Sequence, residues 1–322
     1  MKLVVLDGYA LNPGDNPWTG LEALGELVVY DRTYPDQVLE RSLDADILMT
    51  NKTVLNRETL SQLKKCRLIS VLATGFNIVD IQAAAEFGIP VANVPSYSTD
   101  SVAQLTFALI LELTHGAADH SRSVLAGDWV KAPDYSYWVQ PLTELAGKTI
   151  GIVGFGRIGQ TVGRIAQAFG MNILAYNPKS RTMPEGLNFR YVTLDELYAS
   201  SDIVTLHCPL TGTNTGMIDG AALAKMKKTA VIVNTARGAL INERDLADAL
   251  NEGRIAAAAL DVLSTEPPKA DNPLLTAKNV RITPHIAWAT LEARRRLMAV
   301  TEQNIRTFLA GNPQNVVNNP IK

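Results

Sequence analysis

The sequence predicts two α/β domains, each built on a parallel β-sheet. The chain has 322 residues, which is too long for one small core and suits two domains. Short apolar runs of strand length alternate with stretches of helical spacing, a pattern typical of parallel sheets covered by helices on both faces. A glycine-rich turn, TIGIVGFGRIGQ, begins a second series of the same kind near the middle of the chain. We therefore expect two doubly wound sheets in sequence order.

In the first series we expect five strands and two helices. The strands are KLVVLD (2–7), VVY (28–30), DILMT (46–50), RLISVLAT (67–74) and PVANVP (90–95). The helices are RETLSQLKKC and IVDIQAAAEFG, the second ending at Gly88. A long apolar stretch from Ser98 to about His120 then repeats leucines on a helical period, which predicts a helix.

The next segment, LAGDWVKAPDYSYWVQPLTELAG, interrupts this pattern with aromatic and proline residues, so we expect an excursion before the second series. The second series predicts strands at TIGIVG, NILAYN, IVTLHCP, VIVNTA, IAAAALDVL and VRIT. After the first of these strands, a helix ending at Gly170 places Ile158, Val162, Ile165 and Phe169 on one face. A last helix is expected around 289–310.

Composition limits the classes of partner. Hydrophobic residues make up 47% and charged residues 19% of the chain, as in ordinary globular proteins. The net charge of −2 favours neither nucleic acid nor an anionic membrane, and no apolar stretch is long enough to span a bilayer. The start, MKLVVLDGYA, lacks the pattern of a signal peptide. Cys66 and Cys208 form no metal-spaced pair, so we expect no metal and a reduced, cytoplasmic setting.

The glycine turn predicts a dinucleotide site. Gly154 allows a tight turn, Gly156 allows close approach of backbone to a pyrophosphate, and Gly159 allows the helix to pack on the sheet. The helix start at Arg157 and Ile158 would present free N–H groups and a positive dipole end to the phosphates. A strand before the turn and a helix after it make the motif specific.

Asn177 stands where such sites usually have an acidic residue that binds the ribose of NAD. Asparagine removes the repulsion of a 2′-phosphate, and Lys179, Ser180 and Arg181 offer cationic and hydrogen-bonding contacts to it. NADP(H) is therefore expected to be tolerated beside NAD(H). The alternative is a basic surface turn that contacts no cofactor.

Three polar residues follow three strands of the second series. Arg237 comes after VIVNTA, Glu266 after AAAALDVL and His285 after VRIT. Ligands of open α/β sheets collect at the carboxyl ends of strands, so these residues are candidates for chemistry. Each also has an ordinary structural explanation, as a solvated charge, a turn residue and a packed imidazole.

Taken together, these motifs resemble the D-isomer-specific 2-hydroxyacid dehydrogenase family over nearly the whole chain. The matching segments are VLATGFNIVD, NVPSYSTDSVAQLTFALIL, the glycine turn, HCPLT, NTARGALINERDLADAL, AALDVLSTEPP and TPHIAWAT. The opening LDGYALNPGDNPW resembles the glycerate dehydrogenase (hydroxypyruvate reductase) branch. The resemblance implies a flavodoxin-like substrate domain, residues 1–99 plus 288–322, and a Rossmann cofactor domain, residues 100–287. It also implies NAD(P)-dependent reduction of a small 2-keto acid, hydroxypyruvate or glyoxylate, to the D-2-hydroxy acid.

The same resemblance implies roles for single residues. His285 would be the general acid/base, and Glu266 would hold its imidazole in place. Arg237 would bind the substrate carboxylate and carbonyl oxygens, with the backbone N–H groups of Thr74 and Gly75 on the other side of the carboxylate.

Further cofactor contacts are implied along the second domain. The loop of His207, Cys208 and Pro209, with Thr213, would lie beside the adenosine. Thr235 and Ala236 would flank the nicotinamide half, and Asp261 would accept from the carboxamide. Val102 and Thr106 would pack near the cofactor, although both also suit a plain helix core.

The family also implies a homodimer formed through the cofactor domain. Tyr135, Tyr137 and Trp138 would belong to the dimer arm, and Trp138 would reach the neighbour's substrate pocket; alternatively these aromatics pack on their own domain. Two other functions stay open. One is the same chemistry on 2-ketogluconate, pyruvate or phosphohydroxypyruvate, and the other is a cofactor-sensing, corepressor-like binding protein.

Overall fold

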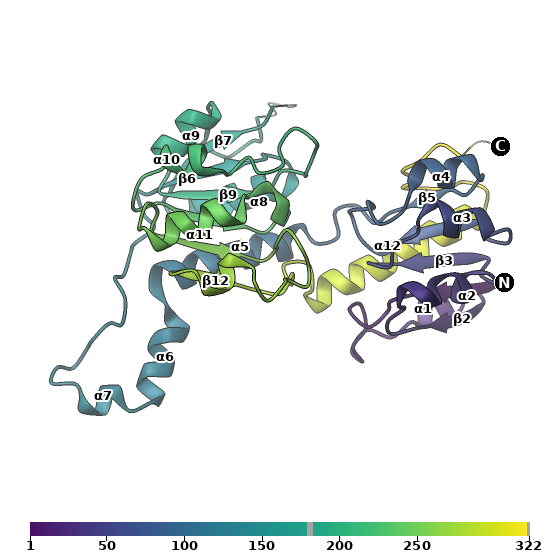
Figure 1. The fold of residues 1–322 in the computed structure, drawn as a ribbon, viewed down its shortest axis with the longest axis horizontal. Helices are drawn as coiled ribbons and strands as arrows, with labels where there is room; N and C mark the ends of the chain where they lie inside the picture. The colour runs from purple at the N-terminus through teal and green to yellow at the C-terminus, as the bar shows by residue number, and fades with distance from the viewer. Residues whose placement is uncertain (179–182, 321–322) are drawn as a thin grey trace. The chain divides into compact units, whose positions relative to one another are not determined.

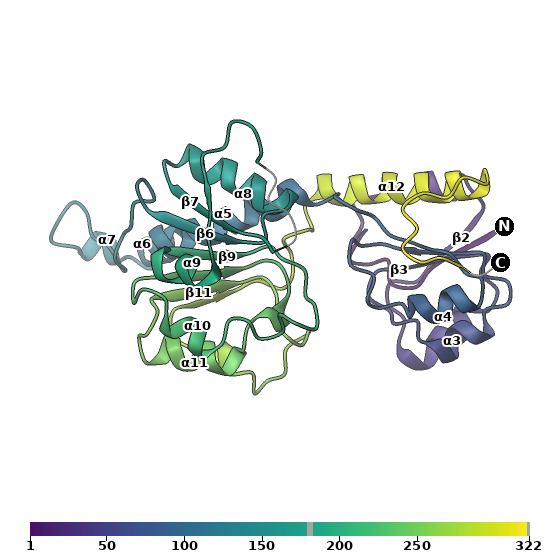
Figure 2. The same cartoon turned by 90° about the horizontal axis from the view of Figure 1, so that it is seen from above.

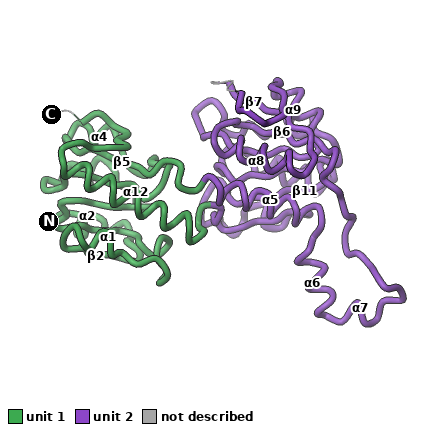
Figure 3. The backbone as a smooth tube through the Cα atoms, turned by 180° about the vertical axis from the view of Figure 1, so that it is seen from behind, with its two compact units in different colours: residues 1–98, 288–322 green, residues 99–287 purple. Residues whose placement is uncertain are grey.

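The structure is a computed structural model that describes residues 1–178 and 183–320. The chain forms two compact units, shown in different colours in Figure 3. Unit 1 contains residues 1–98 and 288–322, and unit 2 contains residues 99–287. The first unit is thus assembled from both ends of the chain, and the second is inserted between them.

Unit 1 is built on a parallel sheet with the strand order β2-β1-β3-β4-β5. Its strands are β1 (Lys2–Val5), β2 (Glu26–Val29), β3 (Ile47–Thr50), β4 (Leu68–Val71) and β5 (Val91–Ala92). The order reverses direction between β1 and β3, as in flavodoxin-like sheets. Apart from β2, the strands are shorter than the predicted apolar runs, and several residues of those runs, such as Leu6 and Leu72, lie in the loops that follow the strands.

Helices cover both faces of this sheet, as Figure 2 shows for α12 on one face and α3 and α4 on the other. The first face carries α1 (Thr19–Glu22) and α12 (Leu291–Leu309), and the second carries α2 (Val38–Ser42), α3 (Arg57–Gln62) and α4 (Ile81–Glu86). A short 3-10 turn, η1 (Pro35–Gln37), precedes α2. Alternate strand residues supply the two cores: Leu3 and Val5 pack toward α12, and Val4 packs toward α2–α4.

Unit 2 is built on a seven-stranded parallel sheet with the order β12-β11-β10-β9-β6-β7-β8. Its strands are β6 (Thr149–Val153), β7 (Asn172–Tyr176), β8 (Arg190–Tyr191), β9 (Ile203–Leu206), β10 (Val231–Asn234), β11 (Ala257–Leu260) and β12 (Val280–Ile282). The order reverses between β6 and β9, which is the Rossmann arrangement and the point where such folds bind dinucleotides. The predicted fold class, two doubly wound parallel sheets, is confirmed.

The helices of unit 2 also form two layers, on the two sides of its sheet in Figure 2. One layer contains α5 (Thr99–His115) and α8 (Arg157–Ala168), and the other contains α9 (Leu194–Ser200), α10 (Gly220–Ala224) and α11 (Glu243–Asn251). Two 3-10 turns, η2 (Gly238–Leu240) and η3 (Pro273–Thr276), complete the unit. Among the described residues, no helix combines the length and the apolar character needed to cross a bilayer.

The helix predicted from Ser98 to about His120 is wrong at its end. The α5 helix stops at His115, Gly116 takes a left-handed conformation (φ 56°), and a second helix, α6 (Ala117–Leu125), follows. Glycine adopts this conformation without the steric cost of a side chain, so the chain can change direction here. The aromatic excursion then contains the short α7 (Asp128–Lys131), and α6 and α7 extend away from the sheet of unit 2 (Figure 1).

The predicted buried face of α8 is only partly correct. Its fully buried residues are Gly159, Val162, Gly163 and Ala166. Ile158 and Ile165 are half-buried, and Phe169 is 40% exposed. The periodicity favoured large apolar side chains, whereas the helix approaches the sheet closely through its small ones. The larger residues lie on the flanks, where Phe169 stacks on Phe107 of α5 with ring centroids 5.4 Å apart.

Candidate active site

The glycine turn joins β6 to α8 at the switch point of the unit 2 sheet. Gly154 has φ +95°, and a Cβ there would lie 2.5 Å from the Cys208 nitrogen, so the turn is packed against the residues that follow β9. A Cβ on Gly159 would lie 2.2 Å from the Gly154 carbonyl oxygen. By contrast, a Cβ on Gly156 would meet nothing within 4 Å. Gly156 therefore faces open space at the amino end of α8, where N–H groups favour an anion.

His207 follows β9 on the other side of the switch point. Its backbone N–H donates to the Val153 carbonyl at 2.7 Å, and its Nε2 lies 2.9 Å from the Thr205 hydroxyl oxygen. The Nδ1 atom is buried and has no partner among the described residues. Burial lowers the pKa of this imidazole to about 3, so the ring is neutral at ordinary pH. A buried nitrogen without a partner, in the segment packed against the Gly154 turn, fits a polar ligand such as a dinucleotide.

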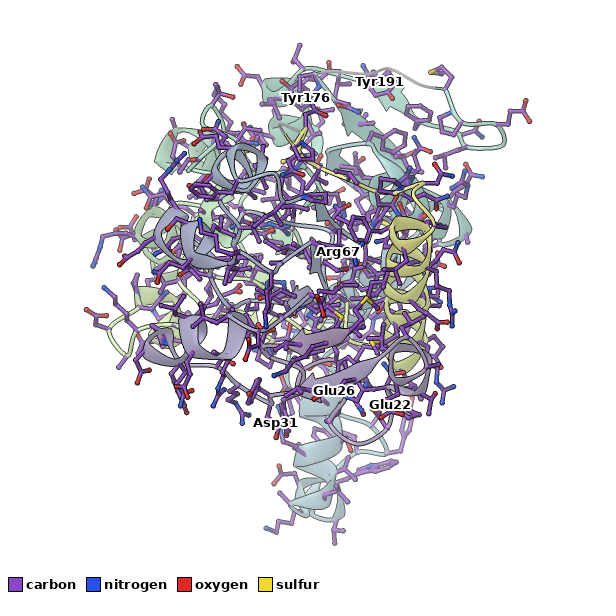
Figure 4. The ribbon with its side chains drawn as sticks, turned by 90° about the vertical axis from the view of Figure 1, so that its right-hand side faces the viewer. Glu22, Glu26, Asp31, Arg67, Tyr176 and Tyr191 are labelled. Atoms are coloured by element: carbon purple, nitrogen blue, oxygen red, sulfur yellow. The ribbon has the colours of Figure 1, made fainter. Side chains whose placement is uncertain are left out.

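Asn177 directly follows Tyr176, the last residue of β7, which Figure 4 labels. The N–H of Gly154 donates to the Tyr176 carbonyl at 2.8 Å, so the end of β7 lies beside the glycine turn. Asn177 therefore follows the strand that lies beside the glycine turn, and its contact with an adenosine ribose stays a prediction. Lys179, Ser180 and Arg181 lie outside the described residues.

The other candidate cofactor residues belong to three segments. Thr235 is buried directly after β10, and its hydroxyl oxygen lies 3.0 Å from the hydroxyl oxygen of Thr106 in α5. The Thr106 hydroxyl also donates to the Val102 carbonyl. The N–H of Ala236 donates to the Asn234 side chain at 3.0 Å. The loop after β9 is closed by the Asn214 amide, which donates to the Pro209 carbonyl at 2.8 Å, and by the hydroxyls of Thr211 and Thr213, 3.2 Å apart.

His285 and Glu266 form a close pair, with Nδ1 of the imidazole 2.6 Å from Oε2 of the carboxylate. Both side chains are partly exposed, 27% for His285 and 34% for Glu266. The other carboxylate oxygen accepts from the N–H of Leu263 at 3.1 Å, which fixes its direction. The Nε2 atom of His285 has no partner within the described part of the chain, so it is available for a hydrogen bond to another molecule.

Asp261 holds the loop that carries His285. Its carboxylate is buried and accepts from the Thr283 hydroxyl at 2.6 Å and from the N–H groups of Ile286 and Ala287, each at 2.8 Å. Its carbonyl accepts from the His285 N–H at 2.8 Å. His285 has φ 55°, a left-handed conformation that costs about 1–2 kcal/mol for a residue with a Cβ. The bonds to Asp261 on both sides of His285 offset this cost, and burial raises the pKa of the Asp261 carboxyl.

Arg237 begins the turn after β10, where its side chain is exposed and Nη1 donates to the Ala236 carbonyl at 2.7 Å. A Cβ on the next residue, Gly238, would lie 1.9 Å from the carbonyl carbon of Leu263. The turn of Arg237 is thus in direct contact with the segment that leads to Glu266. Sequence reasoning missed Gly238 and Thr283, although the glycine after Arg237 was a visible signal of close backbone approach.

In unit 1, Thr74 and Gly75 follow β4. The Thr74 hydroxyl donates to the Val94 carbonyl at 2.8 Å. The backbone N–H groups of Thr74 and Gly75 donate to none of the residues that the structure describes. Two successive N–H groups without acceptors suit an anion such as a carboxylate.

Residues 107–287, more than half of the chain, match the family described as "D-isomer specific 2-hydroxyacid dehydrogenase, NAD binding domain". The chain belongs to this family of dehydrogenases. It is 54% identical over 321 residues to a hydroxypyruvate reductase of Blautia hydrogenotrophica, covering 99% of this chain and 100% of that protein. It is 39% identical over 291 residues to a glycerate dehydrogenase of Methylorubrum extorquens, covering 89% of this chain and 90% of that protein.

Among solved structures, an acyclic imino acid reductase in complex with NADPH and D-Arg has a TM-score of 0.84 at 29% identity, covering 98% of this chain and 100% of that chain. The resemblance to this dehydrogenase family, stated above from motifs, is confirmed, and so is an NAD(P)-dependent enzyme of this class. The individual roles of the site residues stay predictions.

Proposed function

We propose that this dehydrogenase reduces hydroxypyruvate or glyoxylate to the D-2-hydroxy acid, with His285 as the general acid/base. The observation that carries the proposal is the His285–Glu266 pair at 2.6 Å, on a loop that Asp261 holds in a strained conformation. Such strain is typical of positions where geometry matters for chemistry. The substrate follows from the likeness to the hydroxypyruvate reductase and the glycerate dehydrogenase.

In this mechanism Nδ1 of His285 stays bonded to Glu266, so the imidazole presents Nε2 in a fixed direction. The bound dinucleotide supplies the hydride that reaches C2 of the keto acid. Nε2 gives its proton to the C2 oxygen during reduction and takes it back during oxidation. Because Glu266 carries a carboxylate, it stabilises the imidazolium before the proton leaves.

The substrate carboxylate would be held by charge and by backbone dipoles. Arg237 would bind the carboxylate and the keto oxygen with its planar guanidinium, a geometry that lysine does not offer. In unit 1, the N–H groups of Thr74 and Gly75 would donate to the carboxylate. These contacts would orient C2, and orientation of reacting groups accounts for a large part of many rate enhancements.

For the cofactor, we propose that both NADH and NADPH are used. Gly156, Arg157 and Ile158, at the start of α8, would bind the pyrophosphate. Asn177, Lys179 and Ser180 would bind a 2′-phosphate. The absence of a carboxylate at Asn177 supports this, as does the similar reductase that was solved with NADPH. In the same proposal, Asp261 would contact the carboxamide. The rest of the dinucleotide would be contacted by Thr106, His207, Cys208, Pro209, Thr213, Thr235 and Ala236.

We also propose a homodimer formed through unit 2. The segment from α6 to the start of β6 exposes large apolar side chains, including Leu125 (84%), Val130 (90%), Tyr135 (91%) and Trp138 (67%). A set of exposed apolar residues on one extension suits burial against a second copy. Whether Trp138 reaches a neighbour's substrate stays a prediction, as does the cytoplasmic setting.

A panel of keto acids, assayed with NADH and with NADPH, tests the function. We expect the highest kcat/KM for hydroxypyruvate or glyoxylate, and loss of turnover in His285→Ala. Higher kcat/KM for pyruvate or 2-ketogluconate would correct the substrate. Tight cofactor binding without turnover of any keto acid would instead favour a cofactor-sensing binding protein.

A further inference from the structure

The loop after β4 carries the two N–H groups that have no acceptor in the described chain, and the three carbonyl groups from Leu72 to Thr74 are bonded. The Leu72 carbonyl accepts from the Asn51 amide at 2.6 Å, and the Ala73 carbonyl accepts from the Val94 N–H at 3.0 Å. The Thr74 carbonyl accepts from the Asn93 amide at 2.7 Å. These three peptide units are therefore each fixed through their oxygen.

This pattern determines where the N–H groups point. A trans peptide unit is planar, and its N–H points opposite to its C=O. The bond from Asn93 to the Thr74 carbonyl thus sets the direction of the Gly75 N–H, and the bond from Val94 sets that of the Thr74 N–H. Only the first of these two contacts is made by a side chain, so it can be removed by a substitution at Asn93.

Asn93 is itself held in place by buried neighbours. Its side chain and backbone are 8% exposed, and its carbonyl accepts from the Asn304 amide of α12 at 2.9 Å. Asn304 is 1% exposed, and its side-chain oxygen accepts from the Asn315 amide at 2.7 Å. The N–H of Asn93 donates to the Asn315 carbonyl at 3.1 Å. Three asparagines thus connect the end of the chain to the loop after β4.

We infer that Asn93 is a positioning residue for substrate binding: it turns the Gly75 N–H toward the carboxylate of the 2-keto acid. The inference rests on the proposed function, because that function supplies the carboxylate. Asn93 does not contact the substrate; it acts only through the peptide unit between Thr74 and Gly75. Its loss frees that peptide to rotate, which weakens carboxylate binding and leaves proton transfer at His285 unchanged.

The test compares Asn93→Ala and Asn93→Asp with the parent enzyme. In Asn93→Asp a carboxylate faces the Thr74 carbonyl, so the peptide is repelled and the effect is larger. We expect KM for hydroxypyruvate to rise about tenfold in Asn93→Ala, as for loss of one hydrogen bond to a charged group, with kcat and KM for NADH changed less than about threefold. The Kd of oxamate, an unreactive carboxylate analogue, is measured by calorimetry with NADH present and is expected to rise in parallel.

Asn318→Ala is the matched control. Its side chain bonds the amino end of the same strand, accepting from the Val91 N–H at 2.8 Å and donating to the Ile89 carbonyl at 3.0 Å. This control is expected to lower stability without changing KM. If the Asn93 variants do not fold, Asn304→Ala, which frees the Asn93 backbone, is expected to raise KM about threefold for the same reason.

The outcomes separate the two proposals. Folded Asn93 variants whose KM for keto acid and Kd for oxamate stay within twofold of the parent values overturn the role of Asn93 while the enzyme function stands. A parent enzyme that turns over no keto acid overturns the function, and the oxamate measurement then decides on Asn93 alone. A parent enzyme that also fails to bind oxamate overturns both.

Discussion

Nδ1 of His285 and Oε2 of Glu266 lie 2.6 Å apart, although 18 residues separate them in the chain. His285 follows β12 and Glu266 follows β11, and these strands are neighbours in the sheet. The pair therefore exists because parallel strands bring their carboxyl ends to one edge.

The pair leads to a first prediction. His285→Ala is expected to lower kcat by a factor of about 10²–10⁴, the usual contribution of a general acid/base. Glu266→Gln keeps a hydrogen-bonding group but removes the charge, so its kcat is expected to fall less, by about tenfold. Steady-state assays with hydroxypyruvate measure both. Glu252→Gln, at an exposed glutamate of the same unit, is the control, and equal activity of His285→Ala and the parent would refute the assignment.

A second prediction concerns Asp261. In Asp261→Asn one oxygen acceptor becomes an NH2 donor that faces the donors of the loop around His285. We expect a loss of about 1–3 kcal/mol in the free energy of unfolding, measured in urea, as for an unsatisfied buried group. We also expect kcat to fall at least tenfold, because the left-handed His285 loses its support. Thr283→Val removes a single donor and should show a smaller loss in both quantities; wild-type kcat in Asp261→Asn would exclude a role of this loop in catalysis.

The buried His207 predicts acid sensitivity. Its pKa is about 3 in the folded state, and an exposed histidine has about 6.5. Between these two pH values the unfolded chain therefore binds one more proton than the folded chain. The contribution of His207 to the free energy of unfolding is fully present above pH 6.5 and is lost as the pH falls toward 3. At pH 5 the loss is about 2 kcal/mol. Urea unfolding at pH 7 and pH 5 measures it, and it should disappear in His207→Gln but remain in His115→Gln, at an exposed histidine.

Cofactor choice gives a fourth prediction. Asn177→Asp restores a carboxylate beside the glycine turn, and its repulsion of a 2′-phosphate should lower kcat/KM for NADPH about tenfold or more relative to NADH. Asn172→Asp makes the same charge change at the amino end of the same strand and should leave the ratio unchanged. If the parent enzyme prefers NADH and Asn177→Asp does not alter that preference, residue 177 does not determine cofactor choice.

The exposed arm gives a fifth prediction. Val130→Asp places a charge on an apolar residue that is 90% exposed in the single chain. If unit 2 forms the dimer through this segment, burial of the charge is unfavourable and the variant should sediment as a monomer. Val54→Asp, at an exposed valine of unit 1, should keep the parent's oligomeric state. A monomeric parent enzyme would refute the dimer.

Much of this protein could be predicted from its sequence, because the signals are local. The alternation of strands and helices predicted both sheets, and Gly154, Gly156 and Gly159 predicted the turn at the switch point of unit 2. Arg237, Glu266 and His285 were singled out as candidates because each follows a strand, and strand ends of a parallel sheet converge. The family itself followed from the order of such motifs along the chain.

Only the tertiary structure decided which partners these residues have. Examples are the three donors that converge on Asp261, the contact of Gly238 with Leu263, and the bond from Asn93 to Thr74. Each joins groups far apart in the chain, whose relative placement the sequence does not encode. The break of the long helix at Gly116 and the small-residue face of α8 also depended on packing, which overrides periodicity where backbones must approach closely. The sequence determined the chemistry that this chain carries, and the fold determined the direction in which each group points.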